Sequence, residues 1–169
     1  MKPFIRKLVF LLSLLLFAAC NAPVRYIVVS EDAAQTYSAS PENPAQRFVC
    51  LTHADAQNHS GLLALRRQSD IEDYERTRTD RHDPVERILF HLIRGEYGKA
   101  GDALHEHEAT VPEYLRVLLR ADLAYEAAAN NRANAAQFIK QYQDAFDVQP
   151  CATSREMINL RIRQVRYSQ

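Results

Sequence analysis

The N-terminal stretch constrains most strongly which part of this chain can fold into a domain. Three basic residues precede an almost unbroken apolar run over residues 8–17, and two alanines and Cys20 follow it. A basic start, a short apolar core and small residues before a cleavage point are typical of a secretory signal peptide. The run is shorter than the about 20 apolar residues that a membrane-spanning helix needs. We therefore expect residues 1–19 to be removed and the following 150 residues to form one domain with its own core.

The residues around the expected cleavage point indicate a lipid anchor. Leu16-Phe17-Ala18-Ala19-Cys20 resembles the lipobox of bacterial lipoproteins, although Phe17 occupies a position where the family usually has Leu. The resemblance implies cleavage before Cys20, a diacylglycerol on its sulfur and usually a third acyl chain on the new amino terminus. At about 0.8 kcal/mol per buried methylene, two or three such chains hold a protein on a bilayer permanently. The alternative is an ordinary secretory signal with an incidental cysteine.

The same family resemblance also predicts the location of the protein in the cell. In enteric-type lipoproteins an Asp after the modified cysteine favours retention at the inner membrane, whereas this chain has Asn21. By that rule the protein belongs to the bacterial cell envelope, anchored through Cys20 to the outer membrane and facing the periplasm.

Composition and motifs argue against nucleic-acid binding and against enzymatic activity. Without residues 1–19 the chain has 18 basic and 21 acidic residues, and this mildly acidic balance disfavours binding to phosphate backbones. The sequence contains no P-loop, dinucleotide-binding glycine pattern or nucleophile elbow, and only four glycines. We therefore expect no cofactor and no catalytic residues.

Two cysteines remain after Cys20 has been assigned to lipid. Cys50 and Cys151 form an even pair in what is expected to be an oxidising compartment, which predicts a disulfide between them. It would close a loop of roughly 100 residues and stabilise the fold by about 4 to 5 kcal/mol in the chain-entropy model. The alternative is two buried free thiols. Two cysteines so far apart lack metal-ligand spacing, so we expect no metal site.

The rest of the chain divides into a tether and a helical body. Residues 20–47 predict a lipidated tether, broken by serines and prolines, in which residues 24–29 are β-prone. Residues 48–169 predict a helical domain, and Pro44 could begin its first helix at about residue 45. The clearest helix start is Asp83-Pro84-Val85-Glu86, with Asp83 as N-cap and Glu86 at the capping-box position. Further helices are expected over residues 62–80, 84–94, 97–107, 111–130 and 133–146, and from Thr153 or Ser154 to Tyr167.

Two of the expected helix pairs resemble each other. Residues 95–104 align with residues 130–139 at an offset of 35, each with a turn former, an alanine and then an apolar pair. This pattern is similar to the second half of tetratricopeptide repeats, whose period is about 34. The resemblance implies an array of antiparallel helical hairpins. A generic antiparallel bundle is the alternative, and both belong to the all-α class.

The histidines and the basic last helix are the remaining candidates for chemistry. His105 and His107 are two residues apart, which points their rings about 200° apart on a helix and disfavours a shared metal ion. A cell-wall hydrolase using His91 or the pair His105 and His107 is therefore the least favoured hypothesis. Four arginines give the last helix a basic character: Arg155, Arg161, Arg163 and Arg166. A solvated face is the preferred interpretation, and the alternatives are interaction with the helix dipole, contact with lipid headgroups and contact with an acidic partner.

Anchor, helical body and lack of catalytic motifs together predict a protein-interaction or scaffold module. Its partner would be another protein of an envelope assembly. A narrower alternative is an accessory lipoprotein of a secretion or pilus system, similar in outline to the secretin-escorting pilotins, some of which are small α-helical lipoproteins with a disulfide.

Overall fold

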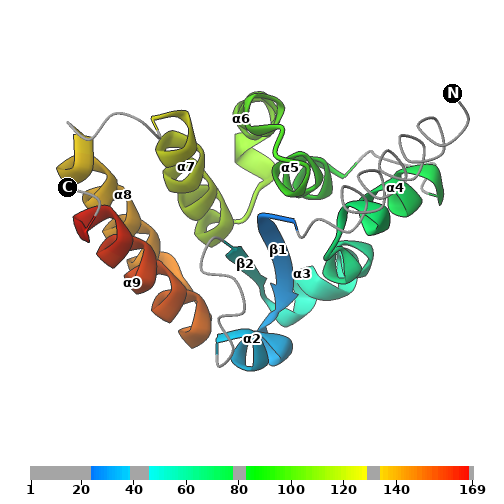
Figure 1. Cartoon of the computed structure of the whole chain (residues 1–169), viewed down its shortest axis with the longest axis horizontal. Helices are drawn as coiled ribbons and strands as arrows, with labels where there is room; N and C mark the ends of the chain where they lie inside the picture. Colours follow the sequence, from blue (N-terminus) through cyan, green and yellow to red (C-terminus); the bar gives the residue numbers. More distant parts are fainter. Residues whose placement is uncertain (1–23, 39–45, 78–82, 129–133, 168–169) are drawn as a thin grey trace, which may run out of the picture.

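The computed structural model describes residues 24–38, 46–77, 83–128 and 134–167, and it confirms the all-α class (Figure 1). Helices make up most of this part of the chain, and two short strands pair within it. The elements are β1 (Tyr26–Ser30), α2 (Glu31–Ser38), β2 (Arg47–Leu51), α3 (His53–Asn58), the 3-10 helix η1 (Ser60–Ala64), α4 (Gln68–Thr77), α5 (Pro84–Ile93), α6 (Tyr97–Glu106), the 3-10 helix η2 (Glu108–Thr110), α7 (Glu113–Ala127), α8 (Ala135–Val148) and α9 (Ala152–Tyr167). Cys20 and the whole predicted signal peptide lie outside the described residues.

The two strands form a parallel pair in the middle of the fold. In their register Tyr26 lies opposite Arg47 and Val29 lies opposite Cys50. Residues 26–29 are all at most 3% exposed, as expected for a parallel strand that is covered on both faces. Figure 1 shows β1 and β2 side by side between the α7–α9 group and α3.

This pair corrects two expectations. The predicted tether spans residues 20–47. Its described residues belong to the folded body, because they supply β1, α2 and the first residue of β2. The helix expected from about residue 45 is instead strand β2, and α3 begins only at His53 with Thr52 as its N-cap. Residues 48–51 are consecutively apolar, and such a run does not distinguish a buried strand from a buried helix.

The segment expected as one helix over residues 62–80 is interrupted. It forms η1 and then α4, with residues 65–67 between them. The carboxylate of Asp70 explains the break, because it accepts hydrogen bonds from the N–H groups of Arg66 and Arg67 at 2.9 and 2.8 Å. These bonds satisfy backbone donors before the helix begins, as a capping residue does.

Most of the later helices follow the sequence signals closely. Asp83 caps α5 by accepting a 3.0 Å hydrogen bond from the N–H of Glu86, and Pro84 is the first helical residue. Gly95 adopts a φ of +74° directly after α5, which lets the chain turn into α6 within three residues. The start of α9 differs from expectation: the helix begins at Ala152, so Thr153 and Ser154 lie in its first turn and do not cap it.

Consecutive helices pack against each other and enclose two hydrophobic clusters. The pairs α5–α6, α7–α8 and α8–α9 make the largest interhelical contacts. Helix α7 divides the clusters: Leu115 and Leu119 pack with the strands, α5 and α6, whereas Leu118 and Ala121 pack with α8 and α9. The second segment of the proposed repeat, residues 130–139, lies partly outside the described residues, so the tetratricopeptide resemblance stays a prediction.

Candidate functional site

The structure brings the two predicted disulfide partners into contact. Cys50 lies in β2, Cys151 directly precedes α9, and their Sγ atoms are 3.0 Å apart although 101 residues separate them in the sequence. Both side chains are buried, at 3% and 2% exposure, and both are free thiols in this structure. The disulfide itself stays a prediction.

The environment of Cys50 makes it a poor nucleophile in the thiol form. Burial, followed by the hydrogen bond with Cys151, raises the pKa of the Cys50 thiol well above its ordinary value. Because the thiolate is the reactive species, a buried thiol with a raised pKa is chemically inert. Cys50 is therefore unsuited to nucleophilic catalysis, whereas its contact with Cys151 is suited to a structural bond.

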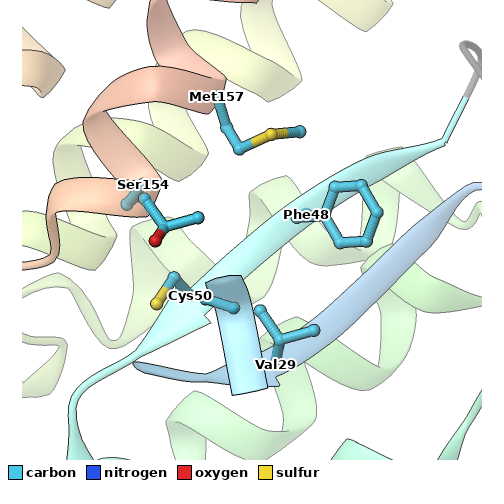
Figure 2. A pocket seen from close by; sticks show the side chains of 7 residues that line it. Val29, Phe48, Cys50, Ser154 and Met157 are labelled. Carbon is cyan, nitrogen blue, oxygen red and sulfur yellow. The ribbon is translucent and has the colours of Figure 1, made fainter. Parts of the chain in front are cut away.

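A small pocket lies beside Cys50, between the strands and α9. Figure 2 shows Met157 and Ser154 on the α9 side, facing Phe48, Cys50 and Val29 from the strands. Its cavity volume is about 10 Å³, roughly the space for one water molecule and far below the roughly 300 to 1,000 Å³ of typical small-molecule sites. The hydroxyl of Ser154 donates a 2.8 Å hydrogen bond to Gln149 Oε1, so a general base is not its partner. The pocket does not have the composition of an active site.

The most unusual polar feature is a buried ionic network centred on Asp122 of α7. Asp122 is fully buried, and its Oδ1 accepts hydrogen bonds from Arg47 at 3.1 Å and from the Tyr142 hydroxyl at 2.9 Å. Its Oδ2 lies 3.3 Å from Nη1 of Arg161, which is 4% exposed. Nη2 of Arg161 donates to the carbonyl oxygen of Phe48 at 2.8 Å. One carboxylate thereby links β2, α7, α8 and α9.

A second buried carboxylate extends this network toward β1. The Glu126 side chain is 2% exposed, and its Oε1 lies 2.9 Å from Arg25 and 3.4 Å from Nε of Arg47. The same oxygen accepts a 3.3 Å hydrogen bond from the Tyr26 hydroxyl. The Arg47 guanidinium also lies over the Tyr125 ring, 4.7 Å from its centroid. The Asp122 carboxylate thus pairs with the buried Arg47 and Arg161. The Glu126 carboxylate pairs with Arg47 and with the exposed Arg25.

The network fixes the protonation states of Tyr26, Tyr142 and Arg47. Burial and the neighbouring Asp122 carboxylate raise the pKa values of the Tyr26 and Tyr142 hydroxyls, so both remain neutral donors. Burial opposes the charge on Arg47, but Asp122 and Tyr142 outweigh it and keep its pKa above the ordinary value. Charges so arranged fix how α7–α9 sit on the strands, and removing one partner of such a set is strongly destabilising.

Sequence reasoning missed this network, and one signal pointed to it. Arg161 was expected on a solvated face, which is wrong. It lies three residues after Ile158 and four before Val165, so helical spacing places it on the same buried face as these two residues. Asp122 similarly follows Leu118 by four residues on α7.

The histidines considered for catalysis are not brought together. His91 Nδ1 lies 2.7 Å from Oε2 of Glu96, and this hydrogen bond lowers the pKa of the Glu96 carboxyl. His105 is exposed on the last turn of α6, and His107 is half-buried just after that helix. Among the described residues, no group of three or more His, Cys, Asp or Glu side chains is placed to hold a metal ion.

A search of the described helices for one long and apolar enough to cross a bilayer finds none. No family model, curated protein or solved structure matches the chain.

Proposed function

We propose that the protein is a membrane-anchored periplasmic lipoprotein that acts as a protein-interaction or scaffold module in an envelope assembly. The basic start, the apolar run and the Cys20 motif support an acylated anchor. The contact between Cys50 and Cys151 allows the disulfide that an oxidising compartment favours. The helical body supports a rigid module between the anchor and a partner.

The observation that carries the interaction role is an apolar ridge on α9. Leu160 and Tyr167 are the large hydrophobic side chains that are exposed among the described residues, at 46% and 88%. They are seven residues apart, about two helical turns, so they lie on one face with Arg163 between them. Tyrosine and arginine are enriched at protein-binding hot spots. A rigid helix with this outward ridge is suited to pack against a helix or groove of a partner protein.

The inner face of α9 makes that ridge a stable platform. Ile158, Ile162 and Val165 are buried against α7 and α8, and Arg161 is bonded to β2 and paired with Asp122. Figure 1 shows α9 at the edge of the molecule, beside α8. A partner that docks on the ridge therefore meets a helix whose position is already fixed, which lowers the entropic cost of binding.

Site-specific photocrosslinking in native membranes tests the interaction role. A photoreactive amino acid at position 160 is expected to capture an envelope protein, and the same group at the exposed position Glu72 of α4 serves as the matched control. With the photoreactive residue kept at position 160, Tyr167→Ser is expected to abolish the capture without changing the unfolding midpoint. Equal capture from positions 160 and 72, or none from either, would contradict the proposal.

The anchor is tested separately. Mass spectrometry of the mature protein is expected to show acyl chains on Cys20, and Cys20→Ser is expected to release the protein from washed membranes. If the wild-type protein is unacylated and leaves the membrane with buffer, the proposed anchoring is wrong.

The narrower alternative is a pilotin-like accessory role in a secretion or pilus system. It shares the anchor, the small helical body and the cysteine pair with the scaffold role. A deletion strain distinguishes the two, because loss of secretin or pilus assembly is expected only for the accessory role.

A further inference from the structure

We infer that the groove between α8 and α9 receives an acidic amphipathic helix of the partner protein, whose carboxylates pair with Arg163 and Arg166. This inference rests on the proposed interaction role of α9, and it specifies the chemistry of the segment that docks there. It adds a charged groove to the apolar ridge of Leu160 and Tyr167.

Two rows of side chains form this groove. Only three residues join α8 to α9, and the two helices pack side by side as an antiparallel hairpin (Figure 1). The lining residues of α8 run from Lys140 to Asp147, and those of α9 run from Asn159 to Arg166. Within each row they are three or four residues apart or adjacent, so each row is one face of its helix. The groove has a volume of about 810 Å³ and extends along about two helical turns, which suits the side chains of a docked helix.

The α9 side of the groove presents two arginines that have no carboxylate partner in the part of the chain that the structure describes. Arg163 and Arg166 are both exposed, and no described carboxylate lies within ion-pair distance of either guanidinium. The ammonium group of Lys140, on the opposite side, already pairs with Asp144 at 3.0 Å. The two arginines are therefore the cations of this groove that can accept a carboxylate from a partner.

The carboxylates of the hairpin are too far away to neutralise these arginines. Asp144 is held by Lys140 on its own helix. Asp147 is one residue from the end of α8 and so lies near the start of α9, whereas Arg163 lies eleven residues beyond that start, about 16 Å along the helix axis. Glu156 precedes Arg163 by seven residues, about 10 Å. Both spacings exceed the about 8 Å over which physiological salt screens exposed charges.

An acidic amphipathic helix matches both parts of this surface. Arg163 lines the groove and also lies between Leu160 and Tyr167 on the ridge. On a helix, side chains three or four residues apart are neighbours, so two carboxylates at that spacing match Arg163 and Arg166, which are themselves three residues apart. An apolar stripe on the same helix can cover Leu160 and Tyr167. Arginine–carboxylate pairs are often bidentate, and such pairs would fix the register of the docked helix.

Identification of the captured segment tests the inference. A photoreactive amino acid replaces Asn159 in the acylated protein in its native membrane, and mass spectrometry sequences the crosslinked peptide. The expected peptide belongs to another envelope protein and carries at least two Asp or Glu residues three or four positions apart. A peptide without such a pair, a peptide of a second copy of this chain, or a crosslink to lipid alone would overturn the inference.

Removal of the two arginines tests their role directly. Arg163→Gln with Arg166→Gln is expected to reduce the capture from position 159 about tenfold at physiological salt. The matched pair Arg67→Gln with Arg76→Gln removes two exposed arginines at α4, and it is expected to change the capture less than twofold. Both arginines of the groove are exposed, so their removal is expected to leave the unfolding midpoint unchanged. Equal capture by the two double variants would contradict the inference.

A charge exchange separates this inference from the proposed function. Arg163→Glu with Arg166→Glu is expected to lose binding to a synthetic peptide of the captured segment, and to regain it when the two carboxylates of the peptide are replaced by lysines. If position 160 captures an envelope protein whether or not the two arginines are present, the groove inference fails and the interaction role stands. If neither position 159 nor position 160 captures a protein, the proposed function fails and this inference fails with it.

Discussion

Removal of the Asp122 carboxylate is the sharpest test of the buried network. Asp122→Ala leaves Arg47 and Arg161 buried, at 8% and 4% exposure, with Glu126 as the remaining nearby carboxylate. Breaking a buried ion pair from one side destabilises a protein by about 3 to 5 kcal/mol, because a charge is left without compensation. The lost hydrogen bond from Tyr142 adds about 1 kcal/mol. We therefore expect the free energy of unfolding to fall by about 4 to 6 kcal/mol, a large fraction of the roughly 5 to 15 kcal/mol of a typical domain.

Equilibrium urea unfolding of the mature Cys20→Ser protein measures this loss, with the cysteine pair kept in one redox state. With a slope of about 2 kcal/mol per molar urea, the midpoint should fall by about 2 to 3 M. Asp144→Ala is the matched control, because Asp144 pairs with Lys140 on the surface of α8 and its side chain is 54% exposed. Such a surface pair contributes about 0.3 to 0.5 kcal/mol. If Asp122→Ala costs no more than Asp144→Ala, the network is not the desolvated structure described above.

Three further predictions concern other parts of the fold. Oxidation of Cys50 and Cys151 to a disulfide is expected to raise the free energy of unfolding by up to about 4 to 5 kcal/mol relative to the reduced protein, and thiol titration of freshly isolated protein under denaturing conditions should then find neither thiol free. Gly95→Ala is expected to lower the free energy of unfolding by about 1 kcal/mol, because Gly95 has a φ of +74°. Gly98→Ala should raise the free energy of unfolding by up to about 1 kcal/mol, because Gly98 lies in a helix with open space around it. The opposite order of the two variants in urea unfolding would contradict the backbone argument. The pKa of the Asp70 carboxyl lies below its ordinary value of 3.8, chiefly because the N–H of Arg66 donates a hydrogen bond to it. Its contribution to stability is therefore present above about pH 4 and is lost as the pH falls through the lowered pKa. Asp70→Asn should make the loss of stability at acid pH less steep, and an unchanged acid pH dependence would show that other carboxyls cause it.

The sequence predicted helix boundaries, which depend on local signals, more accurately than it predicted long-range contacts. Asp83 and Pro84 begin α5, and Gly95 follows its end, as predicted from capping chemistry alone. Helix α6 also ends within one residue of the predicted boundary. These features depend on residues within one turn of each other, so a single sequence carries them directly.

The cysteine pair was also within reach of sequence reasoning. Parity and the expected compartment matched Cys50 with Cys151, and the structure brings these two side chains into contact. Only two candidates remained once Cys20 was expected to carry lipid, and the structure bears out their contact while the disulfide stays a prediction. The pairing did not depend on predicting the path of the chain between them.

The sequence by itself determined the helical class, the turns between helices and the apolar faces, because these follow from the conformational preferences of neighbouring residues. Tertiary structure decided that residues 47–51 form a strand, because a strand is stable only beside a partner, here the β1 residues 26–30. It also decided that Arg161 is buried, since its compensating groups are Asp122 and the carbonyl of Phe48, the latter 113 residues away. A buried charge is tolerated only where such partners converge, and that convergence is a property of the assembled fold.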